Sequence, residues 1–146
     1  KVDKTLAREL GCQIGDEWVQ ISGLRTLGSD RMPICWASVF VVPEYGSIAQ
    51  RLSGSTRPVY EMIAETFKES IENITVRLTA GVLSDPKAKA LGVEPGSPSL
   101  SVSRFYQGRG GKVFEVSISE HPASNFSYTF EFTRGWQTAD HWSWNQ

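Results

Sequence analysis

The sequence predicts an α+β fold in which helices pack on a six-stranded, mainly antiparallel sheet. Three observations predict it: six segments have the apolar pattern of a strand, a Gly-rich turn joins two of them directly, and the helical segments gather in the middle of the chain. At 146 residues, the chain is long enough to bury the core of one domain.

The first two predicted strands cover residues 18–27 and 34–42. Val19 and Ile21 share one face of the first strand, and Gly23 is a candidate bulge. Residues 28–31 have the chemistry of a turn. The second strand is almost continuously apolar, so we expect it to be a central strand covered on both faces.

Helices are predicted next, at residues 45–52 and after Pro58, because proline suits the first turn of a helix. The apolar stripe of the longer helix consists of Tyr60, Ile63, Phe67 and Ile71. A clean alternation then predicts a strand over residues 74–82. Its side chains expected to point inward are those of Ile74, Val76, Leu78, Ala80 and Val82.

The last third of the chain predicts a short helix over residues 84–92, which Gly92 ends in the left-handed conformation. Two strands, at residues 99–107 and 112–121, are joined by the turn Gly108-Arg109-Gly110-Gly111. A final strand is predicted from the alternation of Phe126, Tyr128, Phe130 and Phe132. In the tail that follows we expect docking on the body or on a partner, because it holds Trp136, Trp142 and Trp144.

Charge and composition exclude several classes of function. The net charge is −1 and no basic stripe is present, so we do not expect the chain to hold DNA by itself. No apolar stretch reaches membrane-spanning length and no signal peptide is visible, which predicts a cytoplasmic protein. Cys12 and Cys35 lack metal-ligand spacing, so we expect neither a metal nor a cofactor. A disulfide between them stays open, although Cys35, in its apolar run, is expected as a buried thiol.

Two arginines lie on otherwise apolar strand faces. Arg25 falls on the face of Val19 and Ile21, where an unpaired buried charge would be costly. Its partner is either an anionic ligand or an internal carboxylate, and a bulge at Gly23 would instead place it in solvent. Arg104 shares a face with Tyr106, and there a structural salt bridge is the favoured interpretation.

The returning strand carries a row of polar side chains on one face, namely Glu115, Ser117, Ser119 and His121. The pattern alone favours a solvated face, and the alternative is a polar wall that receives a ligand. Six residues of straight strand span about 20 Å, so Glu115 and His121 can touch one small ligand only if the chain bends near Pro122.

Catalytic chemistry finds little support in the sequence. We find no nucleophile paired with a base and an orienting group, and His121 near Ser119 and Glu120 does not make a triad. The Gly-rich turn joins two strands, whereas a phosphate-binding loop should open a helix. We therefore predict no catalytic residues.

A series of short motifs runs through residues 17–133 in a fixed order. The most distinctive is Leu91-Gly92-Val93-Glu94-Pro95-Gly96-Ser97-Pro98, and the others lie at residues 19–25, 32–43, 57–61, 114–117 and 126–128. The ordered set resembles the UTRA domain, the effector-sensing part of HutC-type regulators in the GntR family. The resemblance implies a chorismate-lyase-like fold, a homodimer, and a preceding winged-helix domain that binds DNA and is controlled allosterically by a metabolite.

The resemblance also implies a division of the chain. No winged helix is visible in the 146 residues, so we expect residues 1–16 to be the remnant of an interdomain linker. Residues 17–133 would form the UTRA domain, and residues 134–146 a Trp-rich C-terminal tail.

By position, the resemblance places ligand contacts on Arg25, on Ala37 or Ser38, on Glu115 and on His121. With Arg104 and Ser117, the predicted ligand-binding set is Arg25, Ser38, Arg104, Glu115, Ser117 and His121. Gly23 replaces the first arginine of the family's pair, which disfavours a sugar phosphate because a phosphate dianion favours several charge-assisted donors.

We therefore expect a small-molecule effector that is a carboxylate or a zwitterion. Two other functions stay open. One is a chorismate-lyase-like enzyme that acts on a small carboxylate, and the other is a plain dimerisation module with a vestigial cleft.

Overall fold

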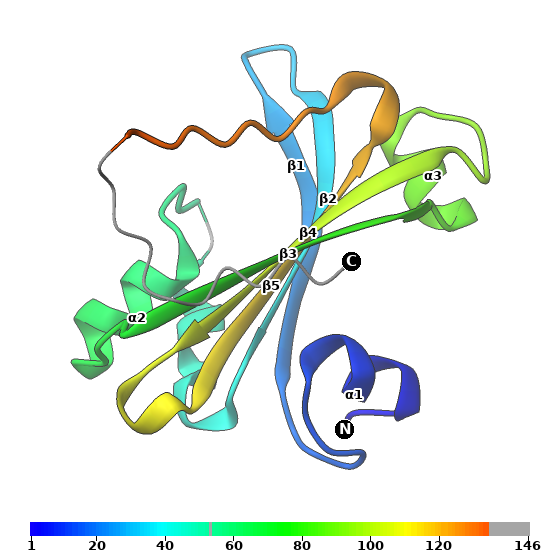
Figure 1. Cartoon of the computed structure of the whole chain (residues 1–146). Helices are drawn as coiled ribbons and strands as arrows, with labels where there is room; N and C mark the ends of the chain where they lie inside the picture. The colour runs from blue at the N-terminus through cyan, green and yellow to red at the C-terminus, as the bar shows by residue number, and fades with distance from the viewer. Residues whose placement is uncertain (53, 135–146) are drawn as a thin grey trace.

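The protein folds around one antiparallel sheet in a computed structural model, which describes residues 1–52 and 54–134 (Figure 1). The sheet has five strands in the order β1-β2-β5-β4-β3, and each neighbouring pair is antiparallel. The strands are β1 (Val19–Leu27), β2 (Met32–Val41), β3 (Asn73–Val82), β4 (Pro98–Gln107) and β5 (Val113–Pro122). The α+β class with an antiparallel sheet is as predicted.

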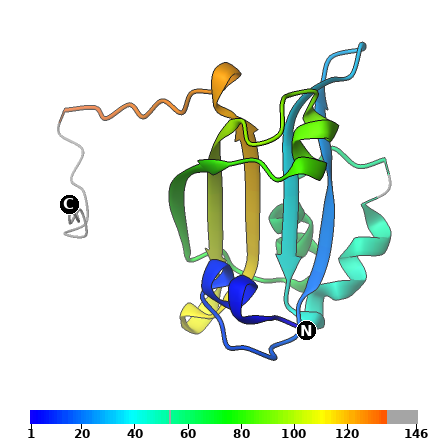
Figure 2. The same cartoon turned by 90° about the vertical axis from the view of Figure 1, so that its right-hand side faces the viewer.

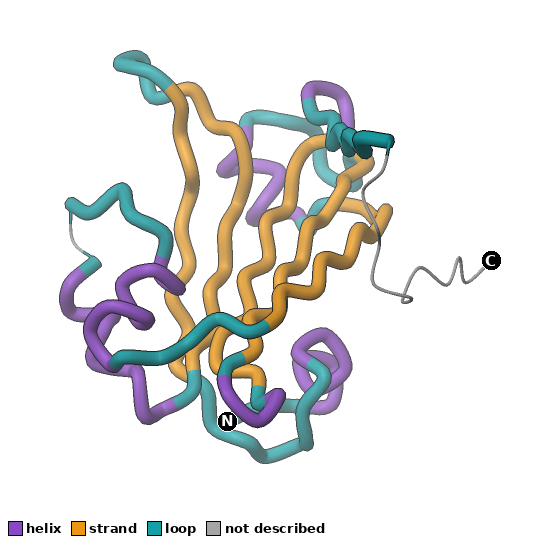
Figure 3. Tube along the Cα trace, turned by 60° about the vertical axis from the view of Figure 1, so that its left-hand side comes forward, coloured by secondary structure: helices purple, strands orange, loops and turns teal. Residues whose placement is uncertain are grey.

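Helices cover both faces of the sheet, as Figures 2 and 3 show. One face, here called the α1 face, carries Phe40, Phe105 and Val116, and it is covered by α1 (Lys4–Leu10) and α3 (Asp85–Leu91). The other, the α2 face, carries Val41 and Tyr106 and packs against α2 (Val59–Phe67) and the 3-10 helix η1 (Pro43–Arg51). Two short 3-10 turns, η2 (Arg109–Gly111) and η3 (Ala123–Asn125), flank β5. No helix among the described residues is long and apolar enough to cross a bilayer.

The segment before β1 contributes to the core. The carboxylate of Asp3 caps α1 by accepting a hydrogen bond from the backbone N–H of Leu6 at 2.8 Å. Val2, Ala7 and Leu10 are buried against the α1 face. The division of the chain into linker, domain and tail stays a prediction, and the α1 part of residues 1–16 packs as part of the body.

The sixth predicted strand is not present among the described residues. The chain after η3 runs as an extended arm, defined here as residues 126–132, which leaves the body and projects beyond the β3 edge of the sheet (Figures 1 and 2). Its aromatic alternation is that of a strand, but no described strand lies beside it to form a hydrogen-bonded ladder. The prediction for residues 135–146 lies outside the described residues.

The bulge in β1 is not at Gly23. Pairing with β2 is regular from Val19 to Arg25, and the register shifts between Arg25 and Thr26, next to the predicted turn. The alternation that places Arg25 on the face of Val19 and Ile21 is therefore preserved.

Coverage of the strands differs from the sequence prediction in two places. The lower part of β2 is covered on both faces, with Phe40 and Val41 buried, but Ile34 near the hairpin tip is 38% exposed. In β3 the apolar face that we expected to point inward is exposed, with Val76 at 40% and Leu78 at 39%. β3 is an edge strand, and no helix of the described residues lies over its α2 face.

Candidate ligand-binding site

A cleft of about 310 Å³ opens on the α2 face, between the sheet and the start of α2. Strands β1, β2, β5 and β4 each contribute to its wall, and Tyr60 of α2 closes one side. Five of the six predicted ligand-binding residues line this one cleft, namely Arg25, Ser38, Arg104, Glu115 and Ser117. Strand β1 is far from β4 and β5 in the sequence. The strand order of the sheet brings their side chains together at the cleft.

Glu115 is the unusual group of the cleft. It pairs across the sheet with Val41 on one side and with Tyr106 on the other, and it is only 1% exposed. Its Oε2 atom is buried without a hydrogen-bond partner among the described residues. Burial alone raises the pKa of this carboxyl to about 8. The solvated-face interpretation is therefore wrong for Glu115.

Two of the three arginines that line the cleft form no ion pair within the described residues. Arg104 is half-buried and makes no ion pair with a described carboxylate, so the salt bridge that we favoured for it is not formed within that part of the chain. Its guanidinium instead lies 6.0 Å from the ring centroid of Tyr128 in the arm. Arg25 lies exposed at the rim and likewise pairs with no described carboxylate. The third arginine, Arg57, forms a salt bridge with Glu65 at 2.8 Å.

The two serines of the predicted set have different positions. Ser117 of β5 hydrogen-bonds the phenol of Tyr106 inside the cleft, where burial and then the Glu115 charge raise the pKa of that phenol. Ser38 borders the cleft, but its hydroxyl accepts a hydrogen bond from Ser22 at 3.0 Å. Alternation along β2 places that hydroxyl, with Phe40, on the α1 face. Its neighbour Ala37 is the β2 side chain on the cleft side.

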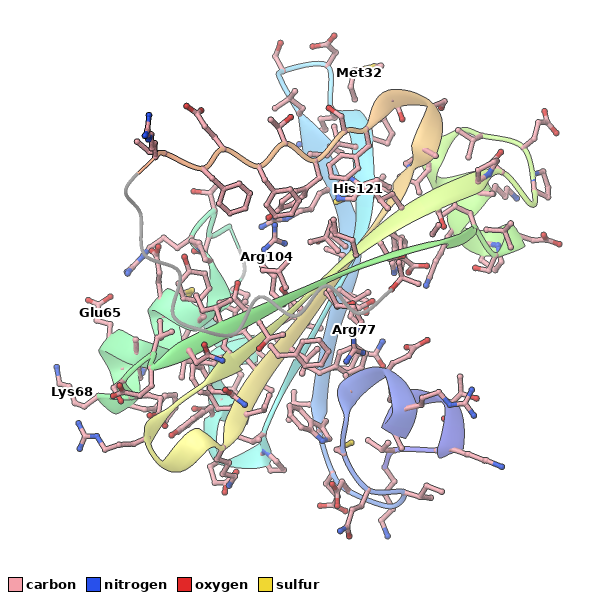
Figure 4. The ribbon with its side chains drawn as sticks, in the orientation of Figure 1. Met32, Glu65, Lys68, Arg77, Arg104 and His121 are labelled. Carbon is pink, nitrogen blue, oxygen red and sulfur yellow. The ribbon has the colours of Figure 1, made fainter. Side chains whose placement is uncertain are left out.

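His121 is not among the residues that line the cleft. Its ring stacks on Phe126 with centroids 3.6 Å apart, and burial lowers the pKa of the imidazole. Figure 4 shows Arg104 and His121 on the side of the sheet along which the aromatic arm runs. The bend after Pro122 turns the chain into the arm and does not bring His121 toward Glu115.

The sequence interpretation missed two aromatic residues of the site. Tyr60 and Tyr106 stack with ring centroids 4.5 Å apart and form the apolar wall beside Glu115. Tyr106 could have been found, because it shares a strand face with Arg104. Tyr60 reads as part of a helical core stripe, and no local signal shows that α2 lies across the cleft.

The arrangement is suited to binding rather than to bond breaking. A buried carboxylate and two arginines without ion pairs offer sites for groups of opposite charge, and the tyrosines offer a flat apolar surface. Among the described residues that line the cleft, no serine hydroxyl is hydrogen-bonded to a histidine or a carboxylate as an activated nucleophile would be.

Comparison with known families agrees with this arrangement. The UTRA domain family matches residues 1–127, which is most of the chain. The chain belongs to the UTRA domain family. The prediction of a UTRA domain is thereby confirmed, and membership of the HutC subfamily stays a prediction. Among curated proteins, none matches the chain.

Solved structures share the fold of this UTRA domain over nearly its whole length. The ligand-binding domain of a putative GntR-family transcriptional regulator from Bordetella bronchiseptica matches with a TM-score of 0.72 and 25% identity, covering 91% of this chain and 82% of that chain. A GntR-family transcriptional regulator from Bacillus cereus matches with a TM-score of 0.74 and 20% identity, covering 90% of each chain. The C-terminal domain of YurK from Bacillus subtilis has a TM-score of 0.74 and 13% identity, covering 90% of this chain and 89% of that chain. The predicted chorismate-lyase-like fold class agrees with these neighbours, with five strands in place of six.

Proposed function

We propose that this UTRA domain is the effector-sensing and dimerising part of a GntR-family transcription regulator of the HutC type. The observation that carries the proposal is the buried, unpartnered Oε2 of Glu115 in a cleft that also contains arginines without ion pairs. A ligand group that donates to this oxygen would recover the cost of burying it without a partner. The similarity to a ligand-binding domain of a putative GntR-family regulator supports the same function. The DNA-binding winged helix would belong to another part of the parent protein, working in the cytoplasm.

The charges of the cleft point to a zwitterionic effector or a small carboxylate. A ligand ammonium or amine group would pair with the carboxylate of Glu115, and a ligand carboxylate would pair with Arg104 or Arg25. Because burial raises the pKa of Glu115 to about 8, binding an ammonium group near pH 7 would release a proton. Gly23, whose Cβ position opens on empty space, supplies no second cation for a phosphate dianion.

Dimerisation would use surfaces that the single chain leaves apolar and exposed. The α2 face of β3 exposes a row of apolar side chains, and the arm exposes Phe130 at 52% and Phe132 at 54%. Both lie toward the same edge of the sheet (Figure 2). A two-fold axis would bury the β3 row and the arm of each copy at once, because an isologous interface uses the same surface twice.

The arm would connect the effector to the dimer. It is held by two contacts with the site strands, the stacking of Phe126 on His121 and the ring of Tyr128 near Arg104. A carboxylate bound to Arg104 would compete with Tyr128 for the guanidinium. The effector would therefore favour one arrangement of the arm by its difference in affinity for the two arrangements.

The proposal is tested by measuring the melting temperature of the purified domain with panels of amino acids, betaines, monocarboxylates, phosphosugars and chorismate. We expect a saturable stabilisation by one zwitterion or monocarboxylate, as binding to the folded state requires. Calorimetric affinity for that compound should fall at least about tenfold in Glu115→Ala and in Arg104→Ala. Lys4→Ala, an exposed change on α1, serves as the control.

Three results would contradict the proposal. Turnover of chorismate would assign an enzyme. The absence of any ligand-induced shift would assign a dimerisation module. Tight binding of a phosphosugar with indifference to carboxylates would remove the proposed effector class.

A further inference from the structure

A second hollow, of about 300 Å³, lies on the α1 face of the sheet. Among the described residues, two separate apolar clusters cover the two ends of this face, one under α1 and one under α3. The hollow lies between them, with Leu6 and Glu9 of α1 on one side and Lys87 of α3 on the other. It is therefore separated by the thickness of the sheet from the cleft that holds Glu115.

The floor of the hollow consists of two rows of side chains that run across four strands. Cross-strand pairing gives the first row as Ser38, Ile118, Ser103 and Arg77. The same pairing gives the second row as Trp36, Glu120, Ser101 and Thr79. Seven of these eight residues, all except Trp36, line the hollow. We name this surface the hydroxyl floor, since four of its side chains are those of serine or threonine.

The hydroxyl floor departs from what packing requires of this position. The next row toward α1 holds the buried Phe40, Val116 and Phe105, as a sheet face under a helix should, and Thr75 at its β3 end. Short hydroxyl side chains in the following two rows leave space where large apolar ones would fill it. Ser103 is only 9% exposed, yet its hydroxyl makes no hydrogen bond to another side chain of the described residues.

Among the described residues that line the hollow, one cation, the exposed Arg77, has no ion pair. Glu120 is neutralised by a salt bridge with Lys87. The guanidinium of Arg77 lies 4.8 Å from the ring centroid of Phe105, which holds it beside Ser103, and it has no ion pair with a described carboxylate. Glu9 stands exposed at the rim, where water screens its charge.

We infer that the hydroxyl floor is a second ligand site, which takes a small polyhydroxylated compound carrying one carboxylate or phosphate. The oxyanion would accept hydrogen bonds from Arg77 and from the hydroxyl of Ser103. The ligand hydroxyls would bond Ser101, Thr79 and the Lys87–Glu120 pair, which offers both donors and acceptors. This site goes beyond the proposed effector cleft, and none of its charged residues belongs to that cleft.

The inference is tested by isothermal titration of the whole chain with gluconate, with glycerol 3-phosphate and with uncharged sorbitol. We expect saturable binding of at least one of the two anions and at least about tenfold weaker binding of sorbitol. The comparison of gluconate with glycerol 3-phosphate decides between a carboxylate and a phosphate. Arg77→Ala should weaken binding of the anion at least about tenfold, whereas Arg8→Ala, an exposed cation of α1 outside the hollow, should leave it unchanged.

A second pair of variants separates the two sites. Ser103→Leu fills the hollow and should abolish binding of the anion, with its melting temperature measured to check the fold. Arg104→Ala removes a cation of the other cleft and should leave that binding unchanged. The inference is overturned if neither anion binds at about 10 mM, if Arg77→Ala binds as the parent does, or if Arg104→Ala alone abolishes binding. The last result would assign the anion to the effector cleft, whereas the first two would leave the proposed effector cleft unaffected.

Discussion

Strands β5 and β3 carry similar alternating patterns, and the folded chain buries them in opposite ways. In β5 the polar row begins with Glu115, which is 1% exposed. In β3 the apolar row is open to solvent, with Val76 at 40% and Leu78 at 39%. β5 is the central strand under α2, whereas β3 is an edge strand whose α2 face is covered by none of the helices in the described part of the chain. The pair shows that alternation assigns side chains to faces, while the elements packed on each face decide which of them are buried.

The burial of Glu115 and the exposure of the apolar row of β3 each have a free-energy cost that a binding partner can remove. The buried carboxylate of Glu115 lacks a donor, and the apolar row of β3 lacks a cover. A ligand would supply the first and a second copy of the chain the second, under the proposed function. The four predictions below break or sharpen this comparison, from the largest expected effect to the smallest.

The pH dependence of stability should reveal the cost of burying Glu115. Its pKa is about 8 in the folded chain against an ordinary value of 4.5, so the folded state holds the proton more tightly. The part of the stability that depends on a protonated Glu115 is therefore fully present below about pH 4.5, and it is lost as the pH rises through about 8. We expect the free energy of unfolding to fall by roughly 3–5 kcal/mol more in the parent than in Glu115→Gln over this interval.

Urea unfolding of both proteins from pH 5 to pH 9 (roughly the interval of this titration) measures the difference. Comparison with Glu115→Gln cancels other titrations, including that of His121, whose pKa is lowered by burial. Parallel curves for the two proteins would show that Glu115 is ionised at no cost, and they would remove the contrast between β5 and β3.

The exposed row of β3 should determine the oligomeric state. Val76→Lys combined with Leu78→Lys places two ammonium groups in the proposed apolar contact, so the dissociation constant of the dimer should rise at least about a hundredfold. Sedimentation equilibrium measures it. Thr75→Lys adds one such ammonium group at an exposed position on the opposite face of β3 and should leave the dimer intact. Equal dissociation constants for the double variant and the parent would exclude β3 from the interface.

The carboxylate of Glu69, unlike that of Glu115, accepts a hydrogen bond from a described side chain, the hydroxyl of Tyr45. The hydroxyl of Tyr45 donates to Glu69 Oε2 at 2.5 Å, and this bond raises the pKa of the phenol to about 12. Tyr45→Phe should lose about 1–2 kcal/mol of stability, because Glu69 Oε2 loses this donor, while Oε1 keeps the backbone N–H of Ser70 at 3.0 Å. Tyr60→Phe should lose less, since its bond to Glu61 is exposed and 3.3 Å long. Urea unfolding near neutral pH measures the stability of both variants, and equal losses would contradict the expectation.

The smallest expected effect concerns the hold on the arm. Tyr128→Ala removes the ring beside Arg104, a cation–π contact of about 0.5–1 kcal/mol at an exposed site. Amide hydrogen exchange in residues 126–132 should accelerate by roughly two- to fivefold. Glu131→Ala, an exposed change in the same segment, should leave the exchange rates unchanged. Unaltered exchange in Tyr128→Ala would show that the contact with Arg104 does not position the arm.

Local signals in the sequence predicted most elements of the fold. The five strands of the sheet, the turn at residues 28–31 and the helix that ends at Gly92 were all predicted, because each depends on a short pattern or on a glycine at positive φ. The predicted strand at residues 126–132 was wrong because a strand also needs a neighbour. The burial predicted for β3 was wrong because burial depends on what packs over the strand.

The sequence could predict those features of the site that depend only on which face of a strand a residue lies on. Alternation assigned Arg25, Arg104 and the pair Glu115 and Ser117 each to one face of its own strand, and the folded sheet brings these faces together in one cleft. It could not indicate that Glu115 is dehydrated, since that depends on α2 and on neighbouring strands. Family resemblance added His121, which the bend after β5 turns toward Phe126. Whether the six predicted residues bind an effector stays a prediction.

Strand β4 separates the two hollows with consecutive residues. Ser101 and Ser103 belong to the hydroxyl floor, whereas Arg104 and Tyr106 belong to the effector cleft. Inserting or deleting one residue in the middle of β4 would exchange the two sets of side chains beyond that point, and inserting two would displace them by about 7 Å along the strand. Natural variation in chain length should therefore be confined to the connections at either end of β4, because its own length is constrained by both of its surfaces.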